Sequence, residues 1–508
     1  MGTRHFQWCL FFGTYLSVAA AIGEENKPSP QWSQFRGPEG QGAAADGTAL
    51  PLEFGPTKNV LWKVPLQLGH SSPCIWNDRI FLAAADSGER RLMTICLDRQ
   101  TGEVRWERSF TVETLEPLHQ LNCPASSTPA TDGRLVYVYF GSYGLLAYDL
   151  DGNEQWKKPL TPMPGWFGSG ASPVVADGLV LLNSGTQSHF SLLAVDAASG
   201  ELKWQKDRPR GFSTGIWSTP AIVHAEHEVQ VFVAGGTSCA AYSLNDGAER
   251  WSVSGLPSIS LNTASIGEGM IFFSLTNPIG EPDNVVKLPT FDEALKQYDR
   301  DSDGKIAASE LPADVMLFSR GRPDKIGDWA PLRELVGRID GDKDGAVNKD
   351  EWQAGIKQLA ELAEKSELAA IAVRLGGEGN VSDTHVAWKQ TTAVPEVPSL
   401  LYHDGRVYLV SEKGILTCRA ATTGKELYKQ RLGTEGTCYA SPVVGDDKIY
   451  VASDGGTVIV FEPGDRYRRL AKNDFDEAIL ATPALVEGKI YLRTQGHLYA
   501  FGLPDLKP

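Results

Sequence analysis

The stretch Ala147–Trp156, AYDLDGNEQW, decides the fold, because close variants of it recur along the chain. Each variant joins a short apolar strand, a turn that contains Gly, and a second strand with an aromatic residue four positions after that Gly. The other copies read CLDRQTGEVRW to Trp106, AVDAASGELKW to Trp204, AYSLNDGAERW to Trp251 and CRAATTGKELY to Tyr428. Two further strands hold the aromatic position without the preceding turn: NVLWKVPL with Trp62 and HVAWK with Trp388.

The spacing of these aromatic positions indicates a repeat architecture. From Trp62 to Tyr428 the successive intervals are 44, 50, 48, 47, 137 and 40 residues. A period of about 40 to 50 residues is typical of propellers and solenoids. The single interval of 137 residues exceeds the others by about 90 residues, so one repeat contains an insertion.

A second element recurs between the aromatic positions and indicates β-hairpins. The copies are PATDGRLVYVYF, PVVADGLVLLNS, LLYHDGRVYLVS, PVVGDDKIYVAS and PALVEGKIYLRT. Branched and aromatic residues around tight polar turns favour antiparallel strands. A hairpin, a third strand and the aromatic strand together make one four-stranded blade. We therefore predict an all-β chain, an eight-bladed β-propeller of four-stranded antiparallel blades, with an α-helical pair inserted in one blade.

The two ends of the chain are complementary, which predicts how the ring closes. NVLWKVPL precedes the first hairpin and has no blade of its own, whereas the last hairpin, from ATPALVEG to LYAFG, has no aromatic strand after it. Pairing the two completes the eighth blade and leaves no open sheet edge.

Two twelve-residue loops lie inside the long interval: DRDSDGKIAASE, Asp299 to Glu310, and DGDKDGAVNKDE, Asp340 to Glu351. Each has Asp at positions 1, 3 and 5, Gly at 6 and Glu at 12, which is the EF-hand calcium pattern. The alternative is a pair of solvated acidic turns, but two full ligand sets with helix-like flanks disfavour it. We expect two Ca²⁺ sites, with position 7 contributing its backbone carbonyl. The expected ligands are Asp299, Asp301, Asp303, Lys305 and Glu310 in the first loop, and Asp340, Asp342, Asp344, Ala346 and Glu351 in the second.

The first residues read as a secretory signal, with Arg4 followed by the apolar run Cys9 to Ala21. No Cys follows this run, so we expect export to the periplasm or medium without a lipid anchor, and no transmembrane span. The formal charge of −15 disfavours nucleic acid as a partner. The predicted organisation is 1–23 signal peptide, 24–58 N-terminal lead-in, 59–279 propeller, 280–366 EF-hand insertion and 367–503 propeller.

The A/D-x-x-T/S-G-x-x-x-W segments resemble the tryptophan-docking repeats of the PQQ-type eight-bladed propellers. That group includes quinoprotein alcohol dehydrogenases and BamB-like outer-membrane assembly propellers. The resemblance covers roughly residues 59 to 275 and 370 to 503, and WSQFRGPEGQG from Trp32 is similar to the N-terminal signature of secreted BamB-like proteins. It implies either a protein-binding or envelope-assembly scaffold, or an oxidoreductase with PQQ in the central channel.

The resemblance also allows the two functions to be weighed. In the dehydrogenases PQQ stacks between a Trp and a disulfide of adjacent cysteines, and this chain has no Cys-Cys pair. PQQ is therefore disfavoured, enzyme activity is left uncertain, and no catalytic residue is assigned. His70, His119 and His189 have no nucleophile or carboxylate at a diagnostic spacing.

A set of residues just before small-residue–Pro turns could face the central channel and bind a protein, peptide or glycan. The alternative is that each is an ordinary packing or capping residue. The set is His70, Asn122, Trp166, Trp217, Asn262 and Tyr439.

Overall fold

The structure is a computed structural model. It describes residues 1–2, 31–45, 47–119, 121–162, 167–185, 189–209, 217–257, 259–276, 289–312, 316–318, 330–364 and 368–504. Residues 3–23 of the predicted signal peptide lie outside this part of the chain. The predicted boundaries of the insertion, at 280 and 366, also lie outside it.

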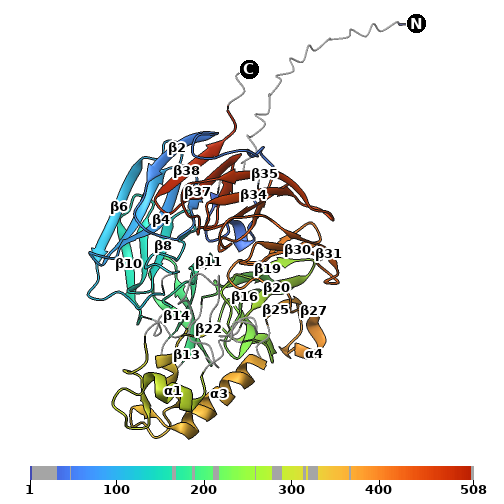
Figure 1. Ribbon diagram of the computed structural model, residues 1–508. Coiled ribbons are helices and arrows are strands. Elements are labelled where there is room, and N and C mark those ends of the chain that lie inside the picture. Colours follow the sequence, from blue (N-terminus) through green and yellow to red (C-terminus); the bar gives the residue numbers. More distant parts are fainter. Residues whose placement is uncertain are drawn as a thin grey trace.

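Eight four-stranded antiparallel blades form a ring around a central axis (Figure 1), which confirms the predicted eight-bladed propeller; β1 (Gln31–Trp32) and β26 (Gly379–Asn380) each add a fifth strand to one blade. In each blade the first strand is innermost and the aromatic strand outermost. Blades 1 to 4 comprise β3 (Cys74–Trp76), β4 (Arg79–Asp86), β5 (Arg91–Asp98), β6 (Val104–Thr111); β7 (Ala130–Thr131), β8 (Leu135–Phe140), β9 (Gly144–Asp149), β10 (Glu154–Pro159); β11 (Val174–Ala176), β12 (Leu179–Gly185), β13 (His189–Asp196), β14 (Leu202–Pro209); and β15 (Ala221–His224), β16 (Val229–Val233), β17 (Ser238–Ser243), β18 (Glu249–Ser254). Blades 5 to 8 comprise β19 (Ser265–Gly267), β20 (Met270–Leu275), β25 (Ala369–Arg374), β27 (Val386–Gln390); β28 (Leu401–His403), β29 (Arg406–Val410), β30 (Ile415–Ala420), β31 (Glu426–Arg431); β32 (Val443–Gly445), β33 (Lys448–Ala452), β34 (Thr457–Glu462), β35 (Arg468–Asp474); and β36 (Ala484–Val486), β37 (Lys489–Arg493), β38 (His497–Gly502), β2 (Val60–Pro65).

The ring closes through its N-terminal strand, as the sequence predicts. β2 pairs antiparallel with β38, and Trp62 stands opposite Ala500 in the register. The first and last parts of the propeller thus share blade 8, so its outer edge is supplied by residues more than 400 positions away in sequence.

The recurring Trp joins neighbouring blades at five of the described joints. The Trp106 ring lies against Gly152, where a Cβ would come within 2.7 Å of the ring, and its Nε1 donates a hydrogen bond to Leu150 O at 2.9 Å. Gly152 has φ +84°, which favours Gly, so the turn needs Gly for both its backbone and its surface. Equivalent Trp–Gly contacts are Trp62 with Gly102, Trp156 with Gly200, Trp204 with Gly247, and Trp388 with Gly424.

The joint between blades 4 and 5 is built differently. Trp251 is fully buried, and its Nε1 donates to Gln230 Oε1 within its own blade. The short strand β26 (Gly379–Asn380) adds in parallel to β18, and α4 (Ser382–His385) follows it. This segment replaces the Gly turn that receives the Trp at the other joints.

The insertion separates β20 from β25 and is mainly helical (Figure 1). It contains α1 (Phe291–Tyr298), β21 (Ile306–Ala307), β22 (Met316–Phe318), β23 (Ala330–Pro331), α2 (Leu332–Ile339), β24 (Ala346–Val347) and α3 (Lys349–Glu364). A capping box between Thr290 and Glu293 starts α1. The insertion has its own apolar core, which includes Phe291 and Trp352 and is separate from the blade cores described.

Residues 31–45, hereafter the N-terminal segment, run along the inside of the ring and include β1 (Gln31–Trp32) and η1 (Pro38–Gly40). β1 pairs with the innermost strand β3, and Ala43 forms a parallel bridge with Val444 of β32. Figure 1 shows this segment as blue ribbon within the ring of blades.

The two faces of the ring differ in what they carry. Strand directions place the turn between the first and second strands of every blade on one face, hereafter the turn face. The connections between second and third strands, and between blades, lie on the other. The insertion joins a second strand to a third, so that face is called the insertion face. After the N-terminal segment the chain leaves along the turn face, where Leu50 N donates to Asp446 Oδ2 at 2.9 Å.

Candidate metal centre and the propeller channel

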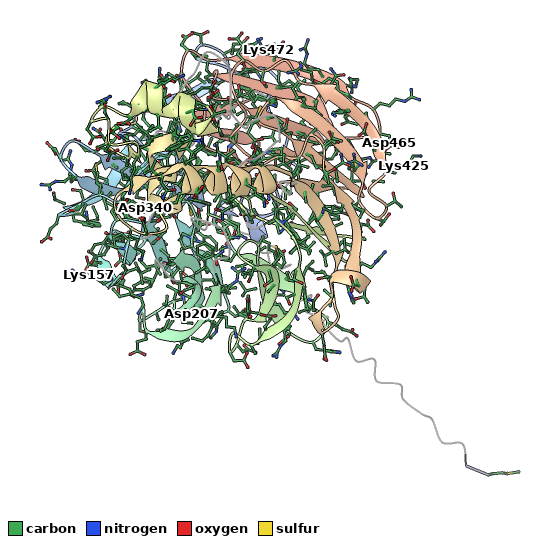
Figure 2. All side chains as sticks on the ribbon, turned by 60° about the horizontal axis from the view of Figure 1, so that its bottom comes forward. Lys157, Asp207, Asp340, Lys425, Asp465 and Lys472 are labelled. Atoms are coloured by element: carbon green, nitrogen blue, oxygen red, sulfur yellow. The ribbon has the colours of Figure 1, made fainter. Side chains whose placement is uncertain are left out.

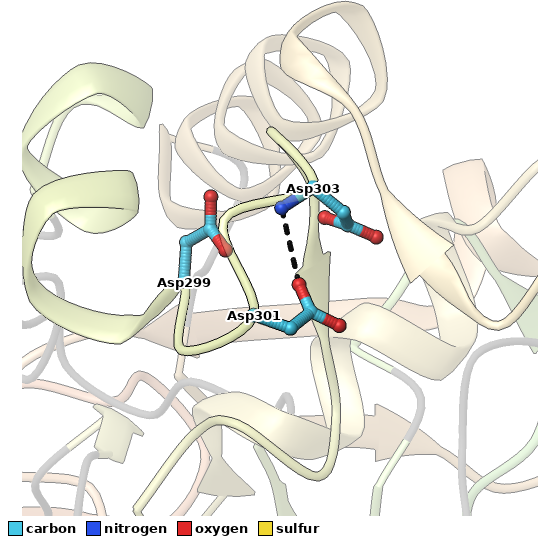
Figure 3. A group of neighbouring side chains, drawn as sticks. All are labelled: Asp299, Asp301 and Asp303. Atoms are coloured by element: carbon cyan, nitrogen blue, oxygen red, sulfur yellow. Dashed lines mark hydrogen bonds between the residues drawn. The ribbon is translucent and has the colours of Figure 1, made fainter.

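The first EF-hand loop brings three carboxylates together (Figure 3). Oxygen atoms of Asp299, Asp301 and Asp303 lie within 4.8 Å of one another. Backbone N–H groups hold them in place: Asp303 N donates to Asp301 Oδ1 at 3.1 Å, and Gly304 N donates to Asp299 Oδ2 at 3.1 Å. Glu310 is buried and closes the loop, since its carboxylate accepts from Arg300 N and from Ala307 N, both at 2.8 Å.

The second loop uses a different set of carboxylates. Here the three oxygens within 4.8 Å belong to Asp340, which is labelled in Figure 2, and to Asp342 and Glu351. Glu351 accepts from Gly341 N at 2.8 Å and from Asn348 N at 3.0 Å. Asp344, the predicted position-5 ligand, is not in this group; its Oδ2 accepts from the ammonium of Lys305.

Short strands join the two loops into one unit. β21 pairs with β24, with Ile306 opposite Val347 and Ala307 opposite Ala346. Both position-8 side chains, Ile306 and Val347, are fully buried in the core of the insertion. The two clusters of carboxylates are therefore held side by side on a shared framework.

Both loops suit a hard divalent cation. Calcium takes six to eight oxygen ligands, and the carboxylates here are short, convergent and supported by backbone N–H groups. In the second loop Asp340 Oδ1 is buried and has no hydrogen-bond partner within the described chain, while Oδ2 accepts from Gly345 N at 2.9 Å. A buried carboxylate oxygen without a donor is costly unless a cation faces it.

The residues predicted to face the channel serve mainly as links between neighbouring loops. Asn122 Nδ2 donates to Phe167 O at 2.7 Å and Ser169 O at 3.0 Å, and Trp217 Nε1 donates to Gly168 O at 2.8 Å. Asn262 is buried, and its Nδ2 donates to Ser274 Oγ at 2.7 Å and Glu396 O at 3.1 Å.

The remaining members of that set, and the histidines considered as acid-base groups, give less information. His70 is partly buried, with its backbone N donating to Ala125 O at 3.1 Å, and Tyr439 is also partly buried. Trp166 and the side chain of His189 lie outside what the structure describes. His119 is buried and stacks on Phe167, with ring centroids 5.0 Å apart.

Several titratable groups on the insertion face have shifted pKa values. Burial raises the pKa of Glu412 to about 8, with a further contribution from the charge of Glu396. Glu412 Oε1 accepts from Glu396 N at 2.9 Å and Val397 N at 2.7 Å, so it joins two loops. Burial also raises the pKa of the Cys123 thiol, but hydrogen bonds from His70 and Ser126 outweigh it and bring the pKa to about 7. These groups hold the loops together, and we assign no chemistry to them.

The N-terminal segment crosses the centre of the ring, a path that the sequence does not predict. Buried Arg36 donates to Leu400 O at 2.7 Å and to Ser265 Oγ at 3.3 Å, reaching blades 5 and 6. Ser33 O accepts from Thr131 N of blade 2 at 2.8 Å. Burial lowers the pKa of the Arg36 guanidinium to about 9, because no carboxylate accompanies it among its described contacts. The expected lead-in is thus a packed part of the propeller.

The cysteines bear on the question of a quinone. Six cysteines of the described chain are free and buried: Cys74, Cys96, Cys123, Cys239, Cys418 and Cys438. None is adjacent to another in sequence. Beyond the two EF-hand loops, the described residues contain no further group of three His, Cys, Asp or Glu ligands within metal-binding distance.

Comparison with known proteins identifies the family of the chain. The family model described as outer membrane protein assembly factor BamB matches residues 53–165, 161–264 and 378–501, which is more than half of the chain. The chain belongs to this family. In this member of the BamB family an EF-hand model also matches residues 291–316 and 337–357, inside the insertion.

Solved structures share the fold of this BamB-family chain at low identity. BamB from Moraxella catarrhalis is 13% identical, with a TM-score of 0.50 over 88% of this chain and 98% of that one. Quinohemoprotein alcohol dehydrogenase from Comamonas testosteroni is 12% identical, with a TM-score of 0.54 over 94% and 82%. A europium-containing methanol dehydrogenase is 10% identical, with a TM-score of 0.54 over 93% and 98%. The fold is therefore shared by assembly factors and by dehydrogenases.

One curated protein shares only a short stretch. Dual oxidase from Drosophila melanogaster is 28% identical over 116 residues, which is 23% of this chain and 7% of that protein. Within the described residues, no helix is long and apolar enough to cross a membrane.

Proposed function

We propose that this BamB-family protein is an exported, calcium-binding scaffold that binds partner proteins on its insertion face. One observation carries the proposal: the N-terminal segment occupies the channel and the chain then leaves along the turn face, while the calcium module rises from the other face. A partner that reaches the channel mouth on that face also meets the EF-hand pair. Sequencing the N-terminus of the mature protein would test export, with cleavage expected near residue 23.

Calcium binding is the first part of the proposal. The ligands are the carboxylates of Asp299, Asp301, Asp303 and Glu310, and those of Asp340, Asp342, Asp344 and Glu351, with the carbonyls of Lys305 and Ala346. Calorimetric titration should give about two sites per chain, with dissociation constants as weak as about 10⁻⁴ to 10⁻³ M if the protein resembles other extracellular modules. The Glu310→Ala, Glu351→Ala double variant should take up no calcium in these loops. Undiminished uptake by that variant would contradict the assignment.

The docking face can be tested with a photo-crosslinking side chain at two exposed acidic positions on neighbouring blades. Glu435 lies in a connection between blades on the insertion face, and Asp404 lies in a turn of blade 6 on the turn face. Irradiation of cells should yield a crosslinked protein from position 435 and none from position 404. The yield at 435 should fall when Glu310 and Glu351 are both replaced by Ala. Equal crosslinking from the two positions would contradict a preferred face.

The second candidate is a quinoprotein oxidoreductase, which the fold shared with two dehydrogenases favours. PQQ has three carboxylates that need cationic partners, and the described residues around the channel are poorly suited to supply them. Two buried cations, Arg36 of the N-terminal segment and Arg493 of β37, already donate to backbone carbonyls. Protein refolded or expressed with PQQ and calcium should therefore show no bound quinone absorbance after gel filtration and no dye-linked alcohol oxidation. A stoichiometric quinone spectrum would favour the enzyme instead.

A further inference from the structure

Lys305 links the two calcium loops through its side chain. Its backbone carbonyl occupies position 7 of the first loop, whereas its ammonium forms an ion pair with Asp344, at position 5 of the second. Each side chain is about one-third exposed, 37% for Lys305 and 36% for Asp344. The pair therefore stands at the surface between the loops, where a second cation could displace the ammonium.

The two loops differ at the position that Lys305 contacts. In the first loop the position-5 carboxylate, Asp303, converges with Asp299 and Asp301. In the second loop the equivalent Asp344 is absent from the convergent group, and Glu351 takes its place. The same backbone bond supports both position-5 residues, from Lys305 N to Asp303 Oδ1 at 2.8 Å and from Ala346 N to Asp344 Oδ1 at 3.0 Å. The ion pair with Lys305 is the contact that distinguishes them.

The pairing of β21 with β24 limits where the ammonium can go. Ile306, the next residue along, is buried opposite Val347, so the backbone at Lys305 is fixed relative to the second loop. A calcium ion in the first loop, held by the Lys305 carbonyl, would fix it further. The side chain then stays within reach of Asp344 whether the first loop is filled or empty.

We propose that Lys305 lowers the calcium affinity of the second loop by pairing with the carboxylate of Asp344, one of the expected ligands, and by placing a positive charge beside the site. This rests on the proposed function, namely that both loops bind calcium. One residue thus serves the first site with its carbonyl and weakens the second with its ammonium, whether or not the first site is filled.

The test measures each loop separately in the full-length protein. Glu310→Gln disables the first loop and leaves the second, and Glu351→Gln does the reverse. Calcium calorimetry and terbium luminescence then report the affinity of the remaining site. Lys305→Met keeps the length of the side chain and the backbone ligand but removes the ammonium, and Lys305→Arg retains a cation.

A matched control removes a positive charge that touches no calcium ligand. Lys349 is position 10 of the second loop itself, but its ammonium pairs with Asp292 of α1, outside both loops, with Nζ 3.1 Å from Oδ1. Lys349→Met therefore has the same effect on net charge, without releasing a carboxylate of either loop. Circular dichroism of every variant checks that the insertion keeps its helices.

In the Glu310→Gln background, Lys305→Met should strengthen binding at the second loop by about two- to fivefold, the upper part of the range expected for releasing one exposed ion pair. Lys349→Met should change it by less than about twofold, because that ammonium is paired with Asp292 outside both loops. Lys305→Arg should also change it by less than about twofold, because Arg keeps the positive charge. In the Glu351→Gln background Lys305→Met should change the first site by less than about twofold, because the ammonium is paired with Asp344 of the second loop.

Equal gains from Lys305→Met and Lys349→Met would overturn the inference, since net charge alone would then explain the result. No gain from Lys305→Met would also overturn it, while leaving calcium binding intact. A wild-type protein that takes up no calcium or terbium would instead overturn the proposed function, and this inference with it.

Discussion

The closure of the ring gives the sharpest prediction about stability, through Trp62. This residue stands in β2, the strand that blade 8 receives from the N-terminal part of the chain. Its ring lies against Gly102 of blade 1 and against Tyr491, with ring centroids 6.1 Å apart, and its Nε1 donates to Arg99 O at 3.1 Å. One side chain therefore connects blade 8 to blade 1.

The magnitude for Trp62→Ala follows from these contacts. A fully buried Trp replaced by Ala costs about 3 to 5 kcal/mol. Trp62 is only partly buried, so the free energy of unfolding of the Trp62→Ala variant should be about 2 to 4 kcal/mol lower than that of the wild type. The lost hydrogen bond contributes about 1 kcal/mol of this difference. Trp62→Phe, which retains a ring but no donor, should lose about half of that. Urea titration monitored by fluorescence measures both losses.

Hydrogen exchange then locates the damage. Trp62→Ala should reduce protection in β37 and β38, residues 489–502, and in the turn at residues 98–103. The control is Trp156→Ala, at an internal joint, where the Trp is 8% exposed and the ring contacts Gly200. Its loss of protection should stay within blades 2 and 3. If Trp62→Ala left residues 489–502 as protected as in the wild type, the reasoning about closure would be refuted.

Three further predictions concern the channel, the inner loops and the insertion. Arg36→Met should lower the free energy of unfolding by about 1 to 3 kcal/mol in urea titrations, because Ser265 Oγ loses its donor and Leu400 O keeps only the hydrogen bond from Ser265; an unchanged midpoint would contradict a stabilising role of the N-terminal segment. Burial raises the pKa of Glu412 from 4.5 to about 8, so between these pH values the folded protein keeps a proton that the unfolded chain releases. Thermal stability should therefore fall as the pH rises from about 4.5 to about 8, and the Glu412→Gln variant should show a smaller fall. Deleting approximately residues 280–366 and joining the ends with a short Gly-Ser linker should leave a sheet-rich protein without the insertion's helices by circular dichroism, because Leu275 and Ala369 are already paired neighbours; complete unfolding would contradict this.

The blades could be predicted from the sequence because their determinants are local. The Gly of the turn and the Trp four residues later are read within one segment, and each Trp needs only the equivalent turn of the next blade. The sequence also shows that the last hairpin lacks an aromatic strand and that the strand at Trp62 lacks a blade of its own. Counting hairpins and aromatic strands therefore predicted that the N-terminal strand completes the last blade, and β2 does pair with β38.

The path of the N-terminal segment could not be predicted in this way. Arg36 reaches Leu400 and Ser265, which are 364 and 229 positions away, and no periodic pattern marks these contacts. The segment WSQFRGPEGQG is similar to an N-terminal family signature, but this similarity does not predict where the segment lies in the fold. The joint at Trp251 was also hidden, because the turn that should receive this Trp is replaced by β26 and α4.

The calcium loops could be located from the sequence, but their inequality could not. The EF-hand spacing assigns Asp303 and Asp344 the same role, at position 5. The pattern describes the residues of one loop and does not include contacts with a side chain of the other loop. Lys305 enters the pattern only through its backbone carbonyl. The ion pair with Asp344 depends on the register of β21 and β24, which a single loop does not specify.

The way the insertion is built restricts how calcium can act on a partner. The apolar core of the insertion, which includes Phe291, Ile306 and Trp352, contains no residue of the blades among its described members. The blades in turn are joined by Trp–Gly contacts that do not involve the calcium loops. Since proteins transmit change through packed contacts, filling the loops should rearrange the insertion while the ring keeps its shape. Any effect of calcium on a partner must then come from direct contact between that partner and the insertion, which is why the crosslinking test compares positions on the two faces instead of searching for movement within the blades.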